Sequence, residues 1–133
     1  MNILLAEDNR ADVLLVREAL SLHHIDHDLH VVRDGEEAIA FVSRMGTPGE
    51  PPCPDLFLLD LNLPRADGPE VLREFRRHPE CAHTPVIVVT SSDMPRDREQ
   101  VEPLGIAHYF RKPADLDEFM ELGAVIEQVV KHR

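Results

Sequence analysis

Three acidic residues stand at the ends of apolar runs in this sequence. Glu7 and Asp8 directly follow the run 3–6, and Asp60 is the last residue of the run 55–60. Because the carboxyl ends of parallel strands meet along one edge of a sheet, these side chains are expected to converge in one crevice. Carboxylates that lie so close together repel one another, so a cation has to lie between them. Hard oxygen ligands indicate Mg²⁺ or Ca²⁺, and Mg²⁺ fits better because it keeps water molecules that phosphate oxygens can replace.

Two further residues extend this group toward phosphate chemistry. Thr90 ends the run 85–90, and Lys112 follows the run 107–110. A carboxylate of Asp60 held beside a metal ion, a hydroxyl and an ammonium can attack a phosphoryl group, because the cations stabilise the charge on the phosphoryl oxygens. A single acid at a strand end is usually solvated or caps a helix. The prediction therefore rests on five residues that occur together at matching strand ends.

Short apolar runs alternate with amphipathic stretches along the whole chain, which predicts alternating strands and helices. The predicted strands are 3–6, 29–32, 55–60, 85–90 and 107–110. Helices are predicted over 11–20, 35–44 and about 95–103. Two further helices are predicted to begin at Gly68 and at Asp115. Uniformly apolar strands are buried on both faces, so the sheet is parallel and has helices on either side. The expected fold class is α/β, a flavodoxin-like doubly wound (βα)5 domain with a five-stranded parallel sheet in the order 2-1-3-4-5.

The length and composition predict a single acidic domain covering residues 1–133, and no effector domain is expected. With 14 Lys and Arg against 25 Asp and Glu, the formal net charge is −11, which disfavours binding to nucleic acid or to an anionic membrane. No apolar run approaches the roughly 20 residues that span a bilayer, and the N-terminus turns acidic before a signal sequence forms. Cys53 and Cys81 are expected to be free thiols, because a domain of this size needs no bridge. We therefore expect a cytoplasmic protein that binds neither DNA nor membranes.

Four motifs lie at the predicted strand ends. They are Leu-Leu-Ala-Glu-Asp-Asn at 4–9, Leu-Leu-Asp-Leu-Asn-Leu-Pro at 58–64 with Asp-Gly at 67–68, Val-Val-Thr-Ser at 88–91, and Arg-Lys-Pro at 111–113. Together they resemble the motifs of the response-regulator receiver family (CheY-like), and the match covers essentially the whole chain with the spacing intact. The resemblance implies a phosphorylation-controlled switch on the flavodoxin-like fold.

The resemblance also implies a role for each acidic residue of the predicted crevice. Asp60 is the expected phosphoacceptor, and Asp8 and Asp60 are expected to bind Mg²⁺ directly. Glu7 is expected to act mostly through water. Asn62, two residues beyond Asp60, is expected to give its backbone carbonyl to the metal ion.

Residues near the last two predicted strands receive roles from the same resemblance. Lys112 is expected to contact the phosphoryl group, and Thr90 to donate a hydrogen bond to it. The Lys112–Pro113 bond is expected to be cis, which aims the lysine. Tyr109, three residues before Lys112, stands where the family has a rotating aromatic side chain. Thr90, Tyr109 and Pro113 are therefore the predicted switch residues.

These features favour a single-domain response regulator of a two-component phosphorelay. It is expected to accept on Asp60 a phosphoryl group from a sensor histidine kinase and to switch the binding of a downstream protein target. No enzymatic activity is expected beyond its own phosphorylation and slow dephosphorylation. An aspartate-nucleophile phosphatase of free substrates needs a second acid where this chain has Asn62. A flavodoxin needs a Ser/Thr/Gly-rich loop where Glu7 and Asp8 would repel phosphate. A non-phosphorylated adaptor is a further alternative, although no member of the acid, Thr and Lys set is missing.

Some departures from the family pattern point to a sub-family. Arg10 stands where many relatives have Pro, and Ala114 where many have Phe. The loop 45–54 is longer than usual and contains four prolines. This loop and the sequence Asn-Arg-Ala-Asp-Val at 9–13 resemble the single-domain regulators paired with bacterial phytochromes. A bacterial phytochrome is therefore the predicted kinase partner.

The last predicted helix carries two apolar stripes. Its expected sheet-facing stripe, at about 100° per residue, consists of Leu116, Phe119, Met120, Gly123, Ile126 and Val130. A second stripe consists of Leu122, Val125 and Val129. Either a neighbouring helix covers this second stripe, or it is an exposed patch that marks a protein interface. The latter interpretation predicts a homodimer through the fifth helix.

Overall fold

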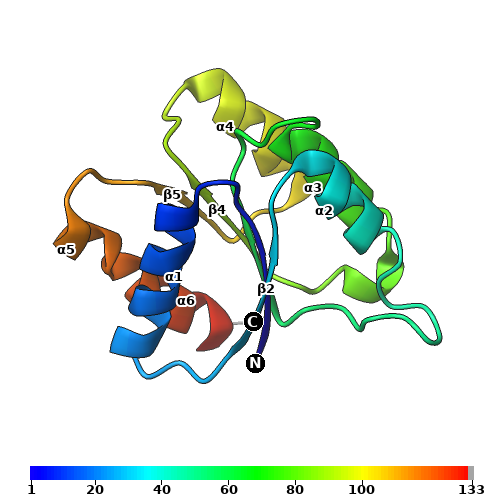
Figure 1. Cartoon of the computed structure of the whole chain (residues 1–133). Coiled ribbons are helices and arrows are strands. Elements are labelled where there is room, and N and C mark those ends of the chain that lie inside the picture. Colours follow the sequence, from blue (N-terminus) through cyan, green and yellow to red (C-terminus); the bar gives the residue numbers. More distant parts are fainter. Residues whose placement is uncertain (132–133) are drawn as a thin grey trace.

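Five short apolar strands lie side by side in a single parallel sheet (Figure 1). The computed structural model describes residues 1–131. The strands are β1 (Asn2–Ala6), β2 (Asp28–Val32), β3 (Leu56–Leu59), β4 (Val86–Thr90) and β5 (His108–Arg111). Their order, β2-β1-β3-β4-β5, confirms the predicted flavodoxin-like topology. β3 and β4 are buried at every position, as predicted for strands that helices cover on both faces.

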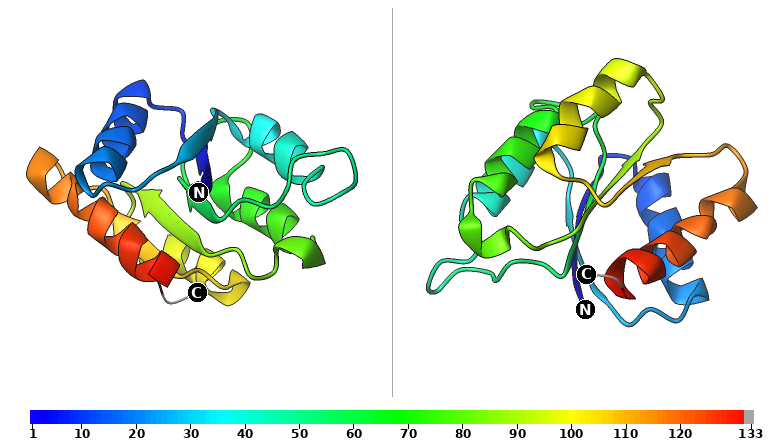
Figure 2. Two further views of the ribbon diagram at one scale, coloured as in Figure 1. Left: turned by 90° about the horizontal axis from the view of Figure 1, so that it is seen from below. Right: turned by 180° about the vertical axis from the view of Figure 1, so that it is seen from behind.

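Helices cover both faces of the sheet (Figures 1 and 2). One face carries α1 (Arg10–Leu22), α5 (Leu116–Phe119) and α6 (Glu121–Lys131). The other carries α2 (Gly35–Val42), α3 (Gly68–Arg76) and α4 (Pro95–Val101), with the 3₁₀ turns η1 (Pro79–Cys81) and η2 (Glu102–Leu104). Among the described residues, no helix is long and apolar enough to cross a membrane.

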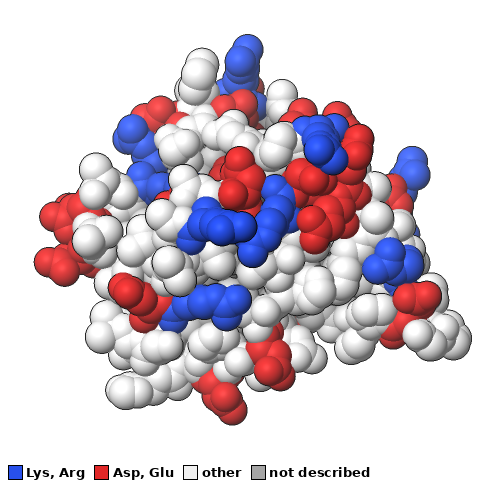
Figure 3. Space-filling model, in the orientation of Figure 1, with Lys and Arg blue, Asp and Glu red and all other residues white. Residues whose placement is uncertain are grey.

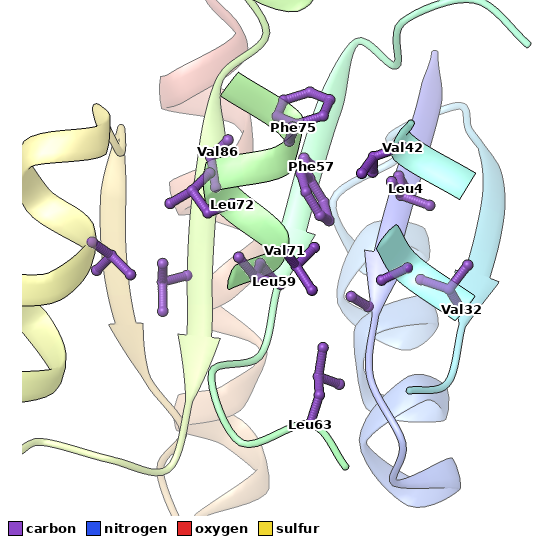
Figure 4. Close-up of a cluster of buried hydrophobic side chains, with 14 of the residues drawn as sticks. Leu4, Val32, Val42, Phe57, Leu59, Leu63, Val71, Leu72, Phe75 and Val86 are labelled. Atoms are coloured by element: carbon purple, nitrogen blue, oxygen red, sulfur yellow. The ribbon is translucent and has the colours of Figure 1, made fainter. Parts of the chain in front are cut away.

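Successive side chains of each strand pack into two separate cores, because they point to opposite faces of the sheet. Leu4 and Phe57 pack with α2 and α3, whereas Leu5 and Leu58 pack with α1 and α6. In the first core, Phe57 meets Phe75 of α3 edge to face, with ring centres 5.0 Å apart (Figure 4). The two cores hold β1 and β3 from both sides and so fix the loops at their carboxyl ends.

An Asn or Asp side chain begins the helix that follows each of four strands. These residues accept hydrogen bonds from backbone N–H groups of the first helical turn: Asn9, Asp34, Asp67 and Asp115. Each one ends a loop that starts at the carboxyl end of a strand. The caps therefore turn the chain back over the sheet and fix the loops that carry the predicted site.

The last helix is not continuous, contrary to the prediction, and is divided at Met120. The backbone N–H of Gly123 donates to the carbonyl of Met120, only three residues earlier. The helix tightens there, and the residues that follow are rotated about its axis. Leu116, expected against the sheet, is 63% exposed, whereas Leu122, expected on the second stripe, is fully buried. The buried residues of this segment are Phe119, Leu122, Gly123 and Ile126.

A disulfide joins Cys53 to Cys81, so the prediction of free thiols is wrong. The loop 45–54 turns back toward η1, where Cys81 is buried, and brings the two Cα atoms to 5.4 Å. The hydroxyl of Thr84 donates to the carbonyl of Pro54 at 3.0 Å and closes the same end of the loop. The cysteines are 28 residues apart, and nothing in the local sequence indicates that the fold brings them together.

Candidate functional site

The carboxyl ends of β1 and β3 lie next to each other and carry the three acidic residues. The backbone N–H of Glu7 donates to the carbonyl of Val32 at 2.9 Å, and that of Asp60 to the carbonyl of Ala6 at 3.0 Å. Glu7 is 1% and Asp60 4% exposed, whereas Asp8 is exposed. One carboxylate oxygen from each of the three residues lies within 4.8 Å of the others. The structure therefore brings together the three carboxylates that the sequence places in one crevice.

The donor set of this cluster fits a hard divalent cation. Three carboxylates supply oxygen ligands in a site that is buried at Glu7 and Asp60 and open at Asp8. The backbone N–H of Asn62 donates to Oδ1 of Asp60 at 3.0 Å, which fixes one oxygen and places Asn62 in the turn beside the cluster. The backbone N–H of Asn9 donates to Oε2 of Glu7 at 3.1 Å, which fixes that carboxylate oxygen. Local backbone contacts thus orient both buried acids.

Lys112 is the cation within this cluster. Its backbone N–H donates to the carbonyl of Thr90 at 2.7 Å, and its side chain is 11% exposed. Its Nζ donates to three carboxylates: Glu7 at 2.7 Å, Asp12 at 2.8 Å and Asp60 at 2.9 Å. Each ammonium proton thus has an acidic acceptor. The sequence prediction does not include Asp12. An acid in the first turn of a helix is common because it interacts favourably with the helix dipole, so its presence there does not indicate a site.

Burial and mutual contact shift the pKa values of two groups in the cluster. Burial raises the pKa of Glu7 to about 7, an effect that the hydrogen bond from Lys112 reduces and the charge of Asp60 increases. Burial alone would lower the pKa of Lys112, but its hydrogen bonds to Asp12 and Glu7 outweigh that effect. The charge of Asp60 adds to them, so the pKa of Lys112 lies above its ordinary value. Near neutral pH, Lys112 is therefore charged while Glu7 is close to its protonation midpoint.

A chain of hydrogen bonds runs from Thr90 to Tyr109. The side-chain amide of Asn62 donates to the hydroxyl oxygen of Thr90 at 3.3 Å, and the backbone N–H of Ser92 reaches the same oxygen at 3.4 Å. The hydroxyl of the half-buried Tyr109 donates to the carbonyl of Ser92 at 2.8 Å. The guanidinium of Arg98 lies over the Tyr109 ring, 4.6 Å from its centre. The sequence prediction includes Thr90 and Tyr109 but neither Ser92 nor Arg98, because nothing in their spacing relates them to the site.

The Lys112–Pro113 bond is trans, since no peptide bond among the described residues 1–131 is cis. The prediction of a cis bond is therefore wrong. For a bond to proline the trans form is the more stable by about 0.5–1 kcal/mol. With this bond trans, Nζ of Lys112 still reaches the carboxylates of Glu7, Asp12 and Asp60.

The surface around the site carries both signs of charge (Figure 3). Next to Lys112, Arg111 pairs with Asp93 of the loop between β4 and α4 at 3.1 Å. The edge of the molecule formed by α5 is acidic, and its exposed acids are Asp115, Asp117 and Glu118.

Comparison with known proteins settles the family. A model of the response regulator receiver domain matches residues 3–123. The chain belongs to this receiver family. Response regulator Rcp1 of Synechocystis sp. is 41% identical over 125 residues, which cover 94% of this chain and 85% of Rcp1. The protein is accordingly a receiver-domain response regulator of two-component signalling.

Two solved structures resemble this receiver domain. The Mn²⁺-bound form of Rcp1 is 40% identical, with a TM-score of 0.82 over 96% of this chain and 91% of that one. The phosphorylated cyanobacterial phytochrome response regulator RcpA is 38% identical, with a TM-score of 0.82 and the same coverage of 96% and 91%. The receiver fold is therefore shared along almost the entire length of the chain.

Proposed function

We propose that this receiver domain accepts a phosphoryl group on Asp60 from a sensor histidine kinase, and that the phosphorylated form switches the binding of a downstream protein. Asp8, Asp60 and the backbone carbonyl of Asn62 would hold Mg²⁺ directly, and Glu7 would act mostly through water. The observation that carries this proposal is the ammonium of Lys112, 2.9 Å from the buried carboxylate of Asp60. A nucleophilic carboxylate with a fixed cation beside it is what phosphoryl transfer needs.

The proposed transfer is a displacement at phosphorus. An oxygen of Asp60 forms the new bond, the bond from phosphorus to the donor's imidazole nitrogen breaks, and the electron pair stays on the imidazole. Lys112 donates to one phosphoryl oxygen and Thr90 to another, so the negative charge meets fixed donors. The acids would hold Mg²⁺ here, and the ion would supply positive charge that offsets part of the charge of the acids and of the phosphoryl group. Attack of water on the acyl phosphate later returns Asp60 to its carboxylate form.

Two alternatives fit the geometry less well. A phosphatase of free substrates needs an acid two residues beyond the nucleophile to protonate the leaving group, and the amide of Asn62 cannot do so. That amide donates to Thr90 at 3.3 Å instead. A non-phosphorylated adaptor has no need for a buried acid cluster around an ammonium, which is costly to desolvate. We therefore infer that the domain catalyses only its own phosphorylation and dephosphorylation.

Tyr109 is the proposed route by which the change reaches the surface. Phosphorylation draws the hydroxyl of Thr90 toward a phosphoryl oxygen, so Asn62 and Ser92 lose the acceptor that they share. Because the carbonyl of Ser92 also holds the hydroxyl of Tyr109 at 2.8 Å, a shift of Ser92 releases the ring, which turns inward. Coupling of this kind between two states is typically about 1–3 kcal/mol.

A bacterial phytochrome is the kinase that we propose as phosphodonor. The similarity to a structure described as a phytochrome response regulator supports this choice. α1 begins at the rim of the site and carries two exposed leucines, Leu14 and Leu22. A kinase that presents a phosphohistidine to Asp60 has to lie against this rim, so α1 is the surface that we expect it to contact.

We also propose a homodimer through α6 and β5. Val125 and Val129 of α6 are half-buried. They line a hollow of about 660 Å³ together with Pro85 and Ala107, which precede β4 and β5. A second copy that covers these apolar groups removes them from water, which favours association.

The cytoplasm is the proposed compartment, because the phosphohistidine donor of a two-component system is formed there from ATP. Fractionation of the cells that express this protein tests the assignment. Recovery in the cytoplasmic fraction would support it, whereas recovery outside the cytoplasm would contradict it.

The proposed phosphorylation is tested by Asp60→Asn. The variant keeps the size of the side chain but lacks the nucleophilic oxygen, so labelling by radioactive acetyl phosphate is expected to vanish. Asp26→Asn removes the same charge from an exposed loop and is expected to label normally. The chain has one tyrosine and no tryptophan, so its fluorescence reports on Tyr109. This fluorescence is expected to change when the native chain is treated with acetyl phosphate and not when Asp60→Asn is treated. Full labelling of Asp60→Asn would overturn the proposal.

A further inference from the structure

Asp12 contacts the site from α1, although it is not among the predicted site residues. Its backbone N–H donates to the side chain of Asn9 at 3.1 Å, which fixes it in the first turn of the helix. Its Oδ2 lies 2.8 Å from Nζ of Lys112, and its side chain is 21% exposed. The two residues are 100 positions apart in the chain. This contact therefore belongs to the tertiary structure of the site and not to the capping of α1.

The three carboxylates that hold Lys112 differ in what else they can bind. Glu7 and Asp60 belong to the group of acids, with oxygens within 4.8 Å of one another, that fits a divalent cation. Asp12 is not a member of that group. When Glu7 and Asp60 face a second positive charge, their attraction for the ammonium is weakened. Asp12 is the acceptor that stays available to Lys112.

The freedom of the Lys112 side chain makes this third acceptor important. Its backbone is fixed by the 2.7 Å hydrogen bond to the carbonyl of Thr90. The four-carbon stem is nevertheless flexible, and a lysine ammonium is strongly hydrated. Without a fixed acceptor, the ammonium would therefore turn toward water. A carboxylate that is itself anchored in a helical turn holds the ammonium in one place.

We propose that Asp12 is a positioning residue, which holds the ammonium of Lys112 beside Asp60 when the other two carboxylates engage a cation. The inference rests on the proposed phosphorylation of Asp60 and adds the first turn of α1 to the machinery that performs it. Asp12 acts through Lys112 and does not itself touch the phosphoryl group.

Asp12→Asn tests this proposal with two independent measurements. The chain has two lysines, Lys112 and the exposed Lys131, so the nitrogen NMR signals of the lysine ammonium groups are readily assigned. We expect the Lys112 signal, which hydrogen bonds protect from exchange with water, in the native chain with and without Mg²⁺. In Asp12→Asn it is expected to disappear once Mg²⁺ is added. The rate of phosphorylation by acetyl phosphate is expected to fall about five- to tenfold, the effect of one lost charge-assisted contact.

Two further variants separate positioning from a general effect of charge or stability. Glu18→Gln removes the same charge from an exposed position of α1 and is expected to match the native chain in both measurements. Asp12→Glu keeps the carboxylate, with one more methylene, and is expected to restore most of the rate. The exposed Lys131 is expected to give no protected ammonium signal in any of these variants, so a protected signal reports on Lys112.

A protected Lys112 signal together with the native rate in Asp12→Asn would overturn the proposal, even if the variant unfolds more easily. A purely structural role changes stability and leaves the ammonium of Lys112 protected. If the native chain takes no label, the proposed function fails. The NMR signal of Lys112 then still decides whether Asp12 holds the ammonium.

Discussion

The two ends of the sheet are built in opposite ways. At the carboxyl ends of the strands, Glu7, Asp12 and Asp60 accept hydrogen bonds from the ammonium of Lys112, and Asp8 lies beside Glu7 and Asp60, so acids outnumber cations. At the amino ends, a disulfide and hydrogen bonds to neutral backbone groups close the surface. The first end gains stability when a further cation binds, because its carboxylates repel one another. The second end has no such need and serves to hold the loops together.

Arg76 and Lys112 show this contrast most clearly. The guanidinium of Arg76, at the end of α3, donates to four backbone carbonyls: Leu104 at 3.0 Å, Cys81 at 3.3 Å, Thr84 at 3.2 Å and Gly105 at 2.7 Å. These acceptors are neutral, and burial lowers the pKa of Arg76. Lys112 donates instead to carboxylates, which raise its pKa. A cation among neutral carbonyls joins loops, whereas a cation among carboxylates can exchange one charged partner for another.

Removal of divalent cations is expected to have the largest effect of these experiments. It is expected to act only on the site at the carboxyl ends of the strands. With EDTA, the rate of phosphorylation by acetyl phosphate is expected to fall at least about a hundredfold, because the acids then repel the phosphoryl anion. Asp8→Ala is expected to weaken Mg²⁺ binding more than Glu7→Ala, since the proposal makes Asp8 a direct ligand. Calorimetric titration with Mg²⁺ measures this order. The reverse order would contradict the proposed ligand roles.

Loss of the disulfide is the matching experiment on the amino end. Cys53→Ser is expected to lower the free energy of unfolding by about 3 kcal/mol without reductant, because the bridge joins residues 28 positions apart. Mg²⁺ affinity and phosphorylation rate are expected to stay within about twofold of native, since distant sites act independently. With reductant, native chain and variant are expected to unfold at similar denaturant concentrations. A large loss of phosphorylation in Cys53→Ser would show that the two ends are coupled.

The pH dependence of the carboxyl end is the smallest expected effect. The pKa of Glu7 rises from 4.5 to about 7 on folding, so protonated Glu7 favours the folded state, and this contribution is lost as the pH rises through that range. Without metal, the Glu7 contribution to stability is therefore expected to fall between pH 4.5 and about 7. Mg²⁺ affinity is expected to rise over the same range, because the cation displaces the proton.

Glu7→Gln is the control for this pH dependence. The variant has no proton to exchange at this position, so both trends are expected to weaken. Thermal unfolding and Mg²⁺ titration at a series of pH values measure them. A native Mg²⁺ affinity that falls with rising pH would contradict the assignment to Glu7.

Most of the fold could be predicted from local sequence patterns. The β-branched run 85–90 becomes β4, and the apolar run 55–60 becomes β3 with Asp60 at its carboxyl end. Asp115, where the last helix is predicted to begin, caps α5. Strand order then brings Glu7 and Asp60 together, because β1 and β3 are neighbours.

Features that depend on contacts between distant segments could not be predicted in the same way. The pairing of Cys53 with Cys81 and the contact of Asp12 with Lys112 each join residues far apart in the chain. The division of the last helix at Met120 depends on how the segment packs against the sheet, so a regular helical wheel misplaces the residues beyond it. The cis Lys112–Pro113 bond is implied by the family resemblance alone, and nothing in the local sequence fixes the isomer, which is trans in the structure.

The central claim is that Asp60 carries the phosphoryl group. Borohydride reduces an acyl phosphate to an alcohol, which converts a phosphorylated aspartate to homoserine, and mass spectrometry of the resulting peptides identifies the position. Homoserine is expected at position 60 in samples phosphorylated with Mg²⁺ and not in samples treated with EDTA. Homoserine at Asp8 or Asp12, or a labelled chain that yields none, would contradict it.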